Sequence, residues 1–153
     1  MDNRKYERES ARARAQENAE SVRRLREFEA FAKFSDHDLE RLVEAAHRTS
    51  TSGPWPLIRE QTPSDSCYIL LSGEAAVFVG HDRIAVVGPG ELIGENALRK
   101  GTLRNATVAT TGRAEVLHIE RADLDRLVDE IPTLRDLMDE TVKRHVPKAE
   151  QST

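Results

Sequence analysis

Apolar residues recur at helical spacing near the start of the chain. Every third position from residue 22 to residue 31 is apolar, which predicts a helix that begins near residue 22. These residues are Val22, Leu25, Phe28 and Phe31. Residues 1–21 have no repeating apolar position, so we expect a charged tail or a solvated helix outside the core.

A second helix is predicted after Ser35, because Ser35 and Asp38 have the spacing of a helix N-cap. One face of this helix is apolar and consists of Leu39, Leu42, Val43 and Ala46.

Helical spacing returns at the C-terminal end, from about Ala122. Pro132 either interrupts this pattern or starts a new helix, since proline is tolerated in the first helical turn. Residues 147–153 are polar and are expected to form a loose tail. The two apolar stripes are Leu124, Leu127, Val128 and Ile131, followed by Leu134, Leu137, Met138 and Val142.

Between these helical regions, short apolar runs alternate with turn sequences. The runs are LIR, CYILL, AAVFV, RIAVV, ATVAT and AEVLHI, and the turns include PSDS, SGE, GHD, GPGE and TGR. This pattern predicts an antiparallel β-roll or jelly roll of about eight short strands. With flanking N-terminal and C-terminal helices, the fold class is α+β and mainly β, in one domain over residues 22–146.

Composition narrows the range of functions and locations expected for the chain. The chain has 153 residues, 33% of them charged, and a formal net charge of -4, so it has no large basic field for nucleic acid. No apolar run suggests a signal peptide or a membrane helix, and a cytoplasmic location is expected. Cys67 is the single cysteine and is expected to be a buried thiol, which excludes a disulfide within the chain.

The segment GENALRKGTLRNAT, residues 94–107, contains the candidate chemistry. Gly94 permits close approach of the backbone, and a helical turn from Asn96 would direct free N–H groups at an anion. Arg104 offers a planar fork of donors for a phosphate. Glu95 would accept hydrogen bonds from sugar hydroxyl groups of the same ligand. Alternatively, Glu95 and Arg104 pair with each other or with water.

The stretch IGENALRKGTLRNATV resembles the phosphate-binding cassette of the cyclic nucleotide-binding domain family, approximately F-G-E-x-A-L, a spacer, and P-R-A-A-T-V. Upstream, GPWPLIREQTPSDSCYILLSGEAAVF is similar to the family pattern P-G-x-x-I-x-x-E-G-x-x-x-x-x-x-Y-x-I-x-x-G-x-x-x-V. The resemblance runs from about Phe31 to Arg144. Members include regulatory subunits of protein kinase A, the catabolite activator protein and cyclic nucleotide-gated channels.

The resemblance implies a role for each position of the cassette. Glu95 would accept from the ribose 2′-hydroxyl and Arg104 would clamp the cyclic phosphate. Asn105 stands where the family often has Ala with cAMP and Thr in cGMP-binding kinases, so the base stays open, with cAMP expected and cGMP as the alternative. The other ligand-binding positions are Gly94, Asn96, Ala97, Leu98 and Ala106, and backbone N–H groups of Ala97, Leu98 and Ala106 would complete the phosphate cradle.

Family members also close a lid from the C-terminal helix over the base. Leu134, Leu137 and Met138 are therefore candidates to touch the purine, and the alternative is that they are core residues. Ile93 and Leu103 depart from the usual Phe and Pro, and Leu103 is expected to loosen the loop that presents Arg104.

These features predict a noncatalytic sensor of a cyclic nucleotide that signals to an effector protein by repositioning its terminal helices. The terminal helices are also candidates for homodimer contacts, and no nucleic-acid or membrane partner is expected. A metal-dependent enzyme on a similar roll would need clustered ligands, whereas the histidines are scattered, so no metal or cofactor is expected. A DNA-binding regulator is not expected, because the chain ends soon after Arg144. The remaining alternative is a structural interaction module that has lost the ligand.

Overall fold

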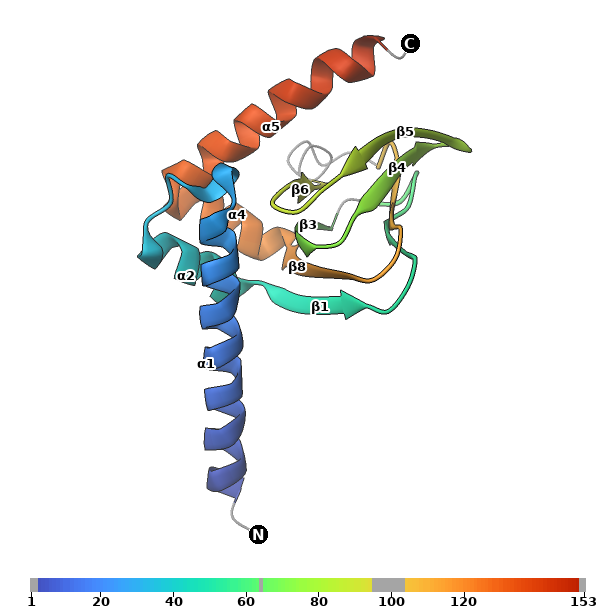
Figure 1. The fold of residues 1–153 in the computed structure, drawn as a ribbon. Coiled ribbons are helices and arrows are strands. Elements are labelled where there is room, and N and C mark those ends of the chain that lie inside the picture. Colours follow the sequence, from blue (N-terminus) through green and yellow to red (C-terminus); the bar gives the residue numbers. More distant parts are fainter. Residues whose placement is uncertain (1–2, 64, 95–103, 152–153) are drawn as a thin grey trace.

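Helices gather on one side of a β-roll, and the first helix projects away from the rest of the molecule (Figure 1). This computed structural model describes residues 3–63, 65–94 and 104–151. The helices are α1 (Asn3–Glu27), the short 3-10 helix η1 (Glu29–Phe31), α2 (Asp36–Ala45), α4 (Arg121–Glu130) and α5 (Pro132–Gln151). None of the helices in the described part of the chain is long and apolar enough to cross a membrane.

In the described part of the chain, eight antiparallel strands form two four-stranded sheets. The first sheet has the order β1-β8-β3-β6 and the second has the order β2-β7-β4-β5. The mainly β roll with flanking helices that the apolar pattern predicts is therefore confirmed. The strands are β1 (His47–Thr51), β2 (Trp55–Ile58), β3 (Ser66–Ser72), β4 (Ala75–Val79), β5 (Asp82–Val87), β6 (Leu92–Ile93), β7 (Thr107–Thr110) and β8 (Ala114–Glu120).

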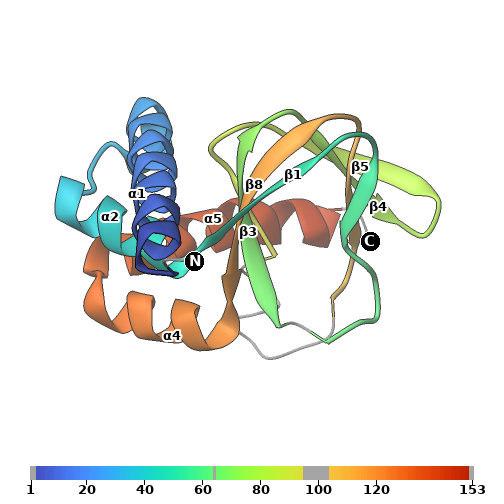
Figure 2. The same cartoon turned by 90° about the horizontal axis from the view of Figure 1, so that it is seen from below.

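The first sheet separates two apolar compartments, because successive side chains of a strand point to opposite faces. Along β3, Ile69 and Leu71 pack with the helices, whereas Leu70 packs inside the roll. Along β8, Leu117 joins the helical compartment and Val116 joins the roll. Figure 2 shows α1, α2 and α4 on one side of β3 and β8 and strands β4 and β5 of the second sheet on the other. Sheet residues therefore contact both the roll interior and the helices.

The N-cap prediction for α2 is confirmed, because the Ser35 hydroxyl accepts a hydrogen bond of 3.1 Å from the Asp38 N–H. Helix α1 begins at Asn3, so the described part of residues 1–21 is the solvated helix of the two alternatives, continuous with the helix predicted from Val22. The prediction needs correction at the other end, because α1 ends at Glu27, before Phe31. Phe28 ends it by adopting an extended conformation, with φ -85° and ψ 133°, and Phe31 then enters the core from η1.

Ionic contacts hold α1 to the first sheet. Arg48 of β1 donates to Glu115 of β8, to the Ser21 hydroxyl at 3.2 Å and to Glu20 at 3.1 Å. Arg24 of α1 also reaches Glu115, at 3.4 Å. The hydrogen bond from Arg48 lowers the pKa of Glu115 below its usual value. The C-terminal third of α1 is thus attached by charge as well as by apolar packing.

Helix α5 begins at Pro132, which resolves the two readings of this proline, and it continues past Pro147 to Gln151. The described part of the expected loose tail, residues 147–151, is helical, because a helix anchored at its start extends by one hydrogen bond per residue. From the helical side, α5 runs alongside the roll toward β4 and β5 (Figures 1 and 2).

Strand β1 was not predicted, because its sequence HRTST lacks an apolar run.

Candidate ligand-binding site

Arg104 lies at the end of the candidate segment, just before β7, and it is buried although it is charged. Only 4% of its surface is exposed. Its Nη1 donates to the Gly94 carbonyl at 2.7 Å, and its Nη2 donates to the Ser66 carbonyl. Two backbone carbonyls, one directly after β6 and one at the start of β3, therefore fix the plane of the guanidinium.

Gly94 is the residue that gives Arg104 its space. It has a φ of +86°, a conformation that favours glycine. A Cβ on Gly94 would lie 2.5 Å from Nη1 of Arg104 and 2.7 Å from Cδ1 of Ile58. The close approach that the sequence predicts at Gly94 is thus one between its backbone and the Arg104 side chain.

The backbone of Arg104 is held by the turn that follows β2. The Gln61 N–H donates to the Arg104 carbonyl at 2.8 Å, and the Arg104 N–H donates to the Thr62 carbonyl at 2.9 Å. The next turn residue back, Glu60, donates its N–H to the Thr107 hydroxyl at 3.1 Å. Sequence reasoning missed this turn, since backbone hydrogen bonds leave little trace in residue identity.

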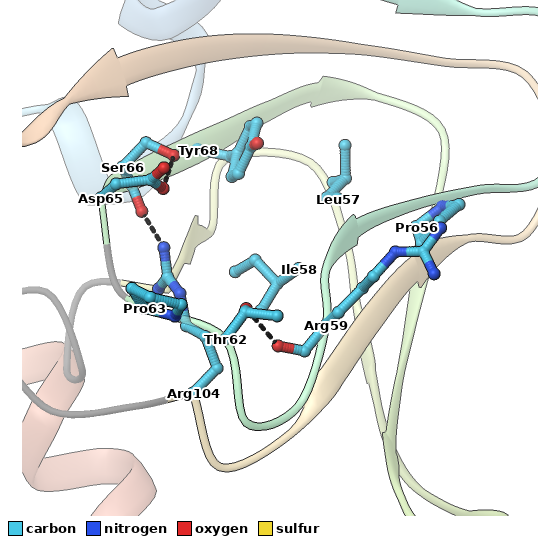
Figure 3. Close-up of a pocket in the computed structure, with 10 residues that line it drawn as sticks. All are labelled: Pro56, Leu57, Ile58, Arg59, Thr62, Pro63, Asp65, Ser66, Tyr68 and Arg104. Carbon is cyan, nitrogen blue, oxygen red and sulfur yellow. Dashed lines mark hydrogen bonds between the residues drawn. The ribbon is translucent and has the colours of Figure 1, made fainter.

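A cavity of about 180 Å³ opens beside Arg104. Figure 3 shows the Arg104 side chain extending toward Ser66, with Tyr68 and Ile58 on the adjoining strands. The polar members of its lining include Arg59, Thr62, Asp65 and Ser66, and the apolar members include Leu57, Ile58 and Tyr68. A cation beside mixed polar and apolar walls is suited to a small anionic ligand with a ring system.

A second cavity, of about 360 Å³, lies where β8 meets α4 and shares Asp65 and Ser66 with the first. His118 lines it and stacks on Tyr68, with ring centroids 4.9 Å apart. Burial lowers the pKa of His118 below its ordinary value. The imidazole is therefore neutral over a wider pH range than an exposed histidine would be.

Comparison with known proteins identifies the fold and the family. The sequence profile of the cyclic nucleotide-binding domain matches residues 56–130, which include Arg104 and all the described residues that line the cavity beside it. This part of the chain belongs to the cyclic nucleotide-binding domain family. A cAMP-dependent protein kinase regulatory subunit of Hypocrea atroviridis is 33% identical over 78 residues, which cover 51% of this chain and 17% of the relative. The sequence-based assignment to this family is confirmed.

A second relative and a solved structure are also similar to this chain, the latter in its fold. A cGMP-dependent protein kinase of Toxoplasma gondii is 31% identical over 91 residues, covering 58% of this chain and 9% of that kinase. A solved structure of cAMP-bound PfPKA-R superposes with a TM-score of 0.80 at 19% identity, over 91% of this chain and 48% of that one. The chain thus spans less than half the length of each of these three relatives.

The structure of the cyclic nucleotide-binding domain locates only some of the predicted ligand-binding residues. Arg104 lines the cavity and is hydrogen-bonded to Gly94, Asn105 is exposed, and Ala106 is partly buried before β7. The predicted positions Glu95, Asn96, Ala97 and Leu98 lie outside the described residues.

The three lid candidates lie in the helical compartment of the domain. Leu134 and Met138 are fully buried there, and Leu137 packs against the same cluster. None of the three is among the described residues that line the cavity beside Arg104. In this conformation the three side chains are core residues, as the alternative interpretation has it.

No group of three or more His, Cys, Asp or Glu side chains suited to a metal ion occurs within the described ranges. His47 and His118 form a cross-strand pair, with ring centroids 6.3 Å apart. Sequence reasoning treated the histidines as scattered and missed this pair, because β1 itself was not predicted.

Proposed function

We propose that this domain is a noncatalytic cytoplasmic sensor that binds a cyclic nucleotide, with cAMP preferred over cGMP. The observation that carries the proposal is the buried guanidinium of Arg104, fixed by the Gly94 and Ser66 carbonyls beside a cavity within the family's matching segment. A preoriented guanidinium binds phosphate strongly, since it loses little side-chain freedom on binding. Relatives named for cAMP and for cGMP support the ligand class and leave the base to experiment.

In the proposed complex, Arg104 donates to the cyclic phosphate and Glu95 accepts from the ribose 2′-hydroxyl. Backbone N–H groups of Ala97, Leu98 and Ala106 complete the phosphate cradle. These roles follow from the resemblance of the segment to the family cassette. Leu134, Leu137 and Met138 would reach the base only if α5 leaves its present packing, so the lid role requires a movement of α5.

A short backbone route supports a link from the site to the C-terminal helices. The Ser66 carbonyl accepts from Arg104, and the carbonyl of the preceding residue, Asp65, accepts from the Arg121 N–H at 2.9 Å. Arg121 is the first residue of α4, which leads into α5. A phosphate that binds Arg104 would therefore affect the hydrogen bond to Ser66, next to Asp65, whose carbonyl bonds the first residue of α4. The ligand favours whichever helix position it binds better.

Calorimetric titration with cAMP and cGMP side by side tests the proposal. We expect wild-type protein to bind both, with cAMP tighter, and Arg104→Leu to weaken binding by at least about tenfold. Arg104→Lys should lose affinity too, because an ammonium cannot reproduce the planar fork. Glu95→Ala should act in the same direction.

The matched control is Arg126→Leu, which removes the same charge from the exposed face of α4 and should leave affinity unchanged. If neither nucleotide binds the wild type, the chain is instead a structural interaction module on the same fold. If Arg104→Leu binds as tightly as the wild type, Arg104 is not the phosphate-binding residue.

A further inference from the structure

Gln61 has a backbone conformation that its side chain does not favour. Its φ is +64°, and it is the single non-glycine residue with positive φ among the described residues. For an L-residue with a Cβ this left-handed region is disfavoured. Its side chain is exposed. In the family pattern quoted above, counting back from Tyr68, glycine stands at this position.

The strained residue makes direct backbone contact with the phosphate-binding arginine. Gln61 N–H donates to the Arg104 carbonyl at 2.8 Å, and Arg104 N–H donates to the Thr62 carbonyl at 2.9 Å. The φ of Gln61 is one of the dihedrals between these two groups, so it sets the direction of one bond relative to the other. Neither bond involves the Gln61 side chain.

The turn is also fixed on its other sides. The Thr62 hydroxyl donates to the Arg59 carbonyl at 2.6 Å, and Glu60 N–H donates to the Thr107 hydroxyl at 3.1 Å. The turn that follows β2 is thus hydrogen-bonded both to Arg104 and to Thr107, the first residue of β7. Backbone strain persists where surrounding bonds over-determine it, and it is frequent at binding sites.

We infer that Gln61 is a positioning residue for anion binding: its left-handed conformation holds the Arg104 backbone where the guanidinium reaches the cavity. The inference rests on the proposed function for its effect on affinity, and on the structure alone for its effect on the Arg104 backbone. To position Arg104, the residue at position 61 must tolerate a positive φ and must have a backbone N–H.

Four variants separate this role from a general effect on folding. Gln61→Gly and Gln61→Asn tolerate positive φ and keep the N–H, so cAMP affinity should stay within about twofold of the wild type. Gln61→Val resists positive φ, and Gln61→Pro excludes it and removes the donor. Both should weaken cAMP binding on the order of tenfold.

The control for general destabilisation is Gly73→Ala. Gly73 has a φ of +88° in the turn between β3 and β4, and a Cβ there would lie 2.5 Å from the Arg113 carbonyl. We expect this variant to lower the melting temperature without changing the affinity of the folded protein for cAMP. A merely structural role for Gln61 predicts the same behaviour for Gln61→Val, and that result would overturn the inference.

A double-mutant cycle shows whether Gln61 acts through Arg104. In the Arg104→Leu background, Gln61→Val should change affinity by less than about twofold, because the group that it positions is already absent. Full addition of the two losses would contradict the inference.

A second readout needs no ligand. Hydrogen exchange of the Arg104 amide, followed by NMR, should be on the order of tenfold faster in Gln61→Val than in Gln61→Gly. Equal exchange in the two variants would overturn the inference, whether or not the protein binds cAMP. Absence of binding by the wild type, with the exchange difference present, would overturn the proposed function and leave the positioning role of Gln61 supported.

Discussion

At the scale of single residues, the site depends on residue 94 being a glycine. Gly94 has no Cβ, and the guanidinium of Arg104 occupies the space where one would lie. The sequence predicted that Gly94 permits close approach and that Arg104 is the anion-binding cation. It did not predict that the two are hydrogen-bonded partners, because their contact depends on how the strands around them pack.

Replacement of Gly94 by alanine should impair both folding and binding. The added methyl group meets Arg104 and Ile58, and the φ of +86° is unfavourable for alanine. We expect a loss of about 1–3 kcal/mol in the free energy of unfolding and at least about tenfold weaker cAMP binding. Urea denaturation and calorimetry measure the two effects.

Gly53→Ala is the matched control, since a Cβ at Gly53 meets nothing within 4 Å. It should leave both quantities near the wild-type values. Equal effects of the two substitutions would contradict the role given to the Gly94 contact.

His118 predicts a pH dependence at the same scale. Burial lowers its pKa below the unfolded value of 6.5, so the folded state disfavours the protonated imidazole. Stability should be fully present above that value and should fall as pH decreases below it, because the unfolded chain then binds more protons. Tyr68, His47, Glu120 and Asp65 surround the ring and remain in place in the variant that tests it.

The test is His118→Gln, compared with wild type in urea denaturation between about pH 5 and pH 7.5. The variant should lose part of the stability decline toward acid pH. An identical pH profile in both proteins would show that His118 is not responsible.

At the scale of elements, the sequence predicted most of the helices and most of the strands, because their apolar periodicity is regular. Strand β1 shows where this reasoning ends. HRTST contains no apolar residue, and it is a strand because it pairs with β8 from His47 to Thr51. That pairing depends on partners about seventy residues away along the chain, which a local pattern does not contain.

The contact between α1 and the first sheet is the element-scale feature with a measurable ionic part. Arg48→Met removes the cation that bonds Glu115, Glu20 and Ser21. We expect a cost of about 1 kcal/mol at neutral pH, since Glu115 is one-third exposed and screened by solvent. Thermal or urea unfolding measures this cost.

The same contact predicts an acid dependence. Because the pKa of Glu115 is lowered in the fold, its contribution is present above the usual 4.5 and is lost as pH falls below that value. The difference between wild type and Arg48→Met should therefore shrink toward acid pH. A constant difference would contradict the ionic explanation.

At the scale of the whole molecule, the first part of α1 is separate from the body, as Figure 1 shows. Residues 3–17 are all exposed, and the first buried residue of the helix is Ser21. Deletion of residues 1–16 should therefore change the melting temperature by no more than about 1 °C, since no core contact is removed. Calorimetric scanning measures it.

Leu25→Ala is the contrasting variant, because Leu25 is fully buried in the helical compartment. It should cost about 2–5 kcal/mol. A large effect of the deletion would show instead that the projecting segment has a partner, such as a second copy of the chain.

The alternation of β3 and β8 between two apolar compartments has a consequence for the fidelity of folding. If β3 paired one residue out of register, Leu70 would turn toward the helices and Ile69 into the roll. A slip of β8 would reverse Val116 and Leu117 in the same way. Both interiors would then be filled with side chains of the wrong shape. Misalignment of these central strands is thus penalised twice, which makes the correct pairing far more favourable than its nearest competitor.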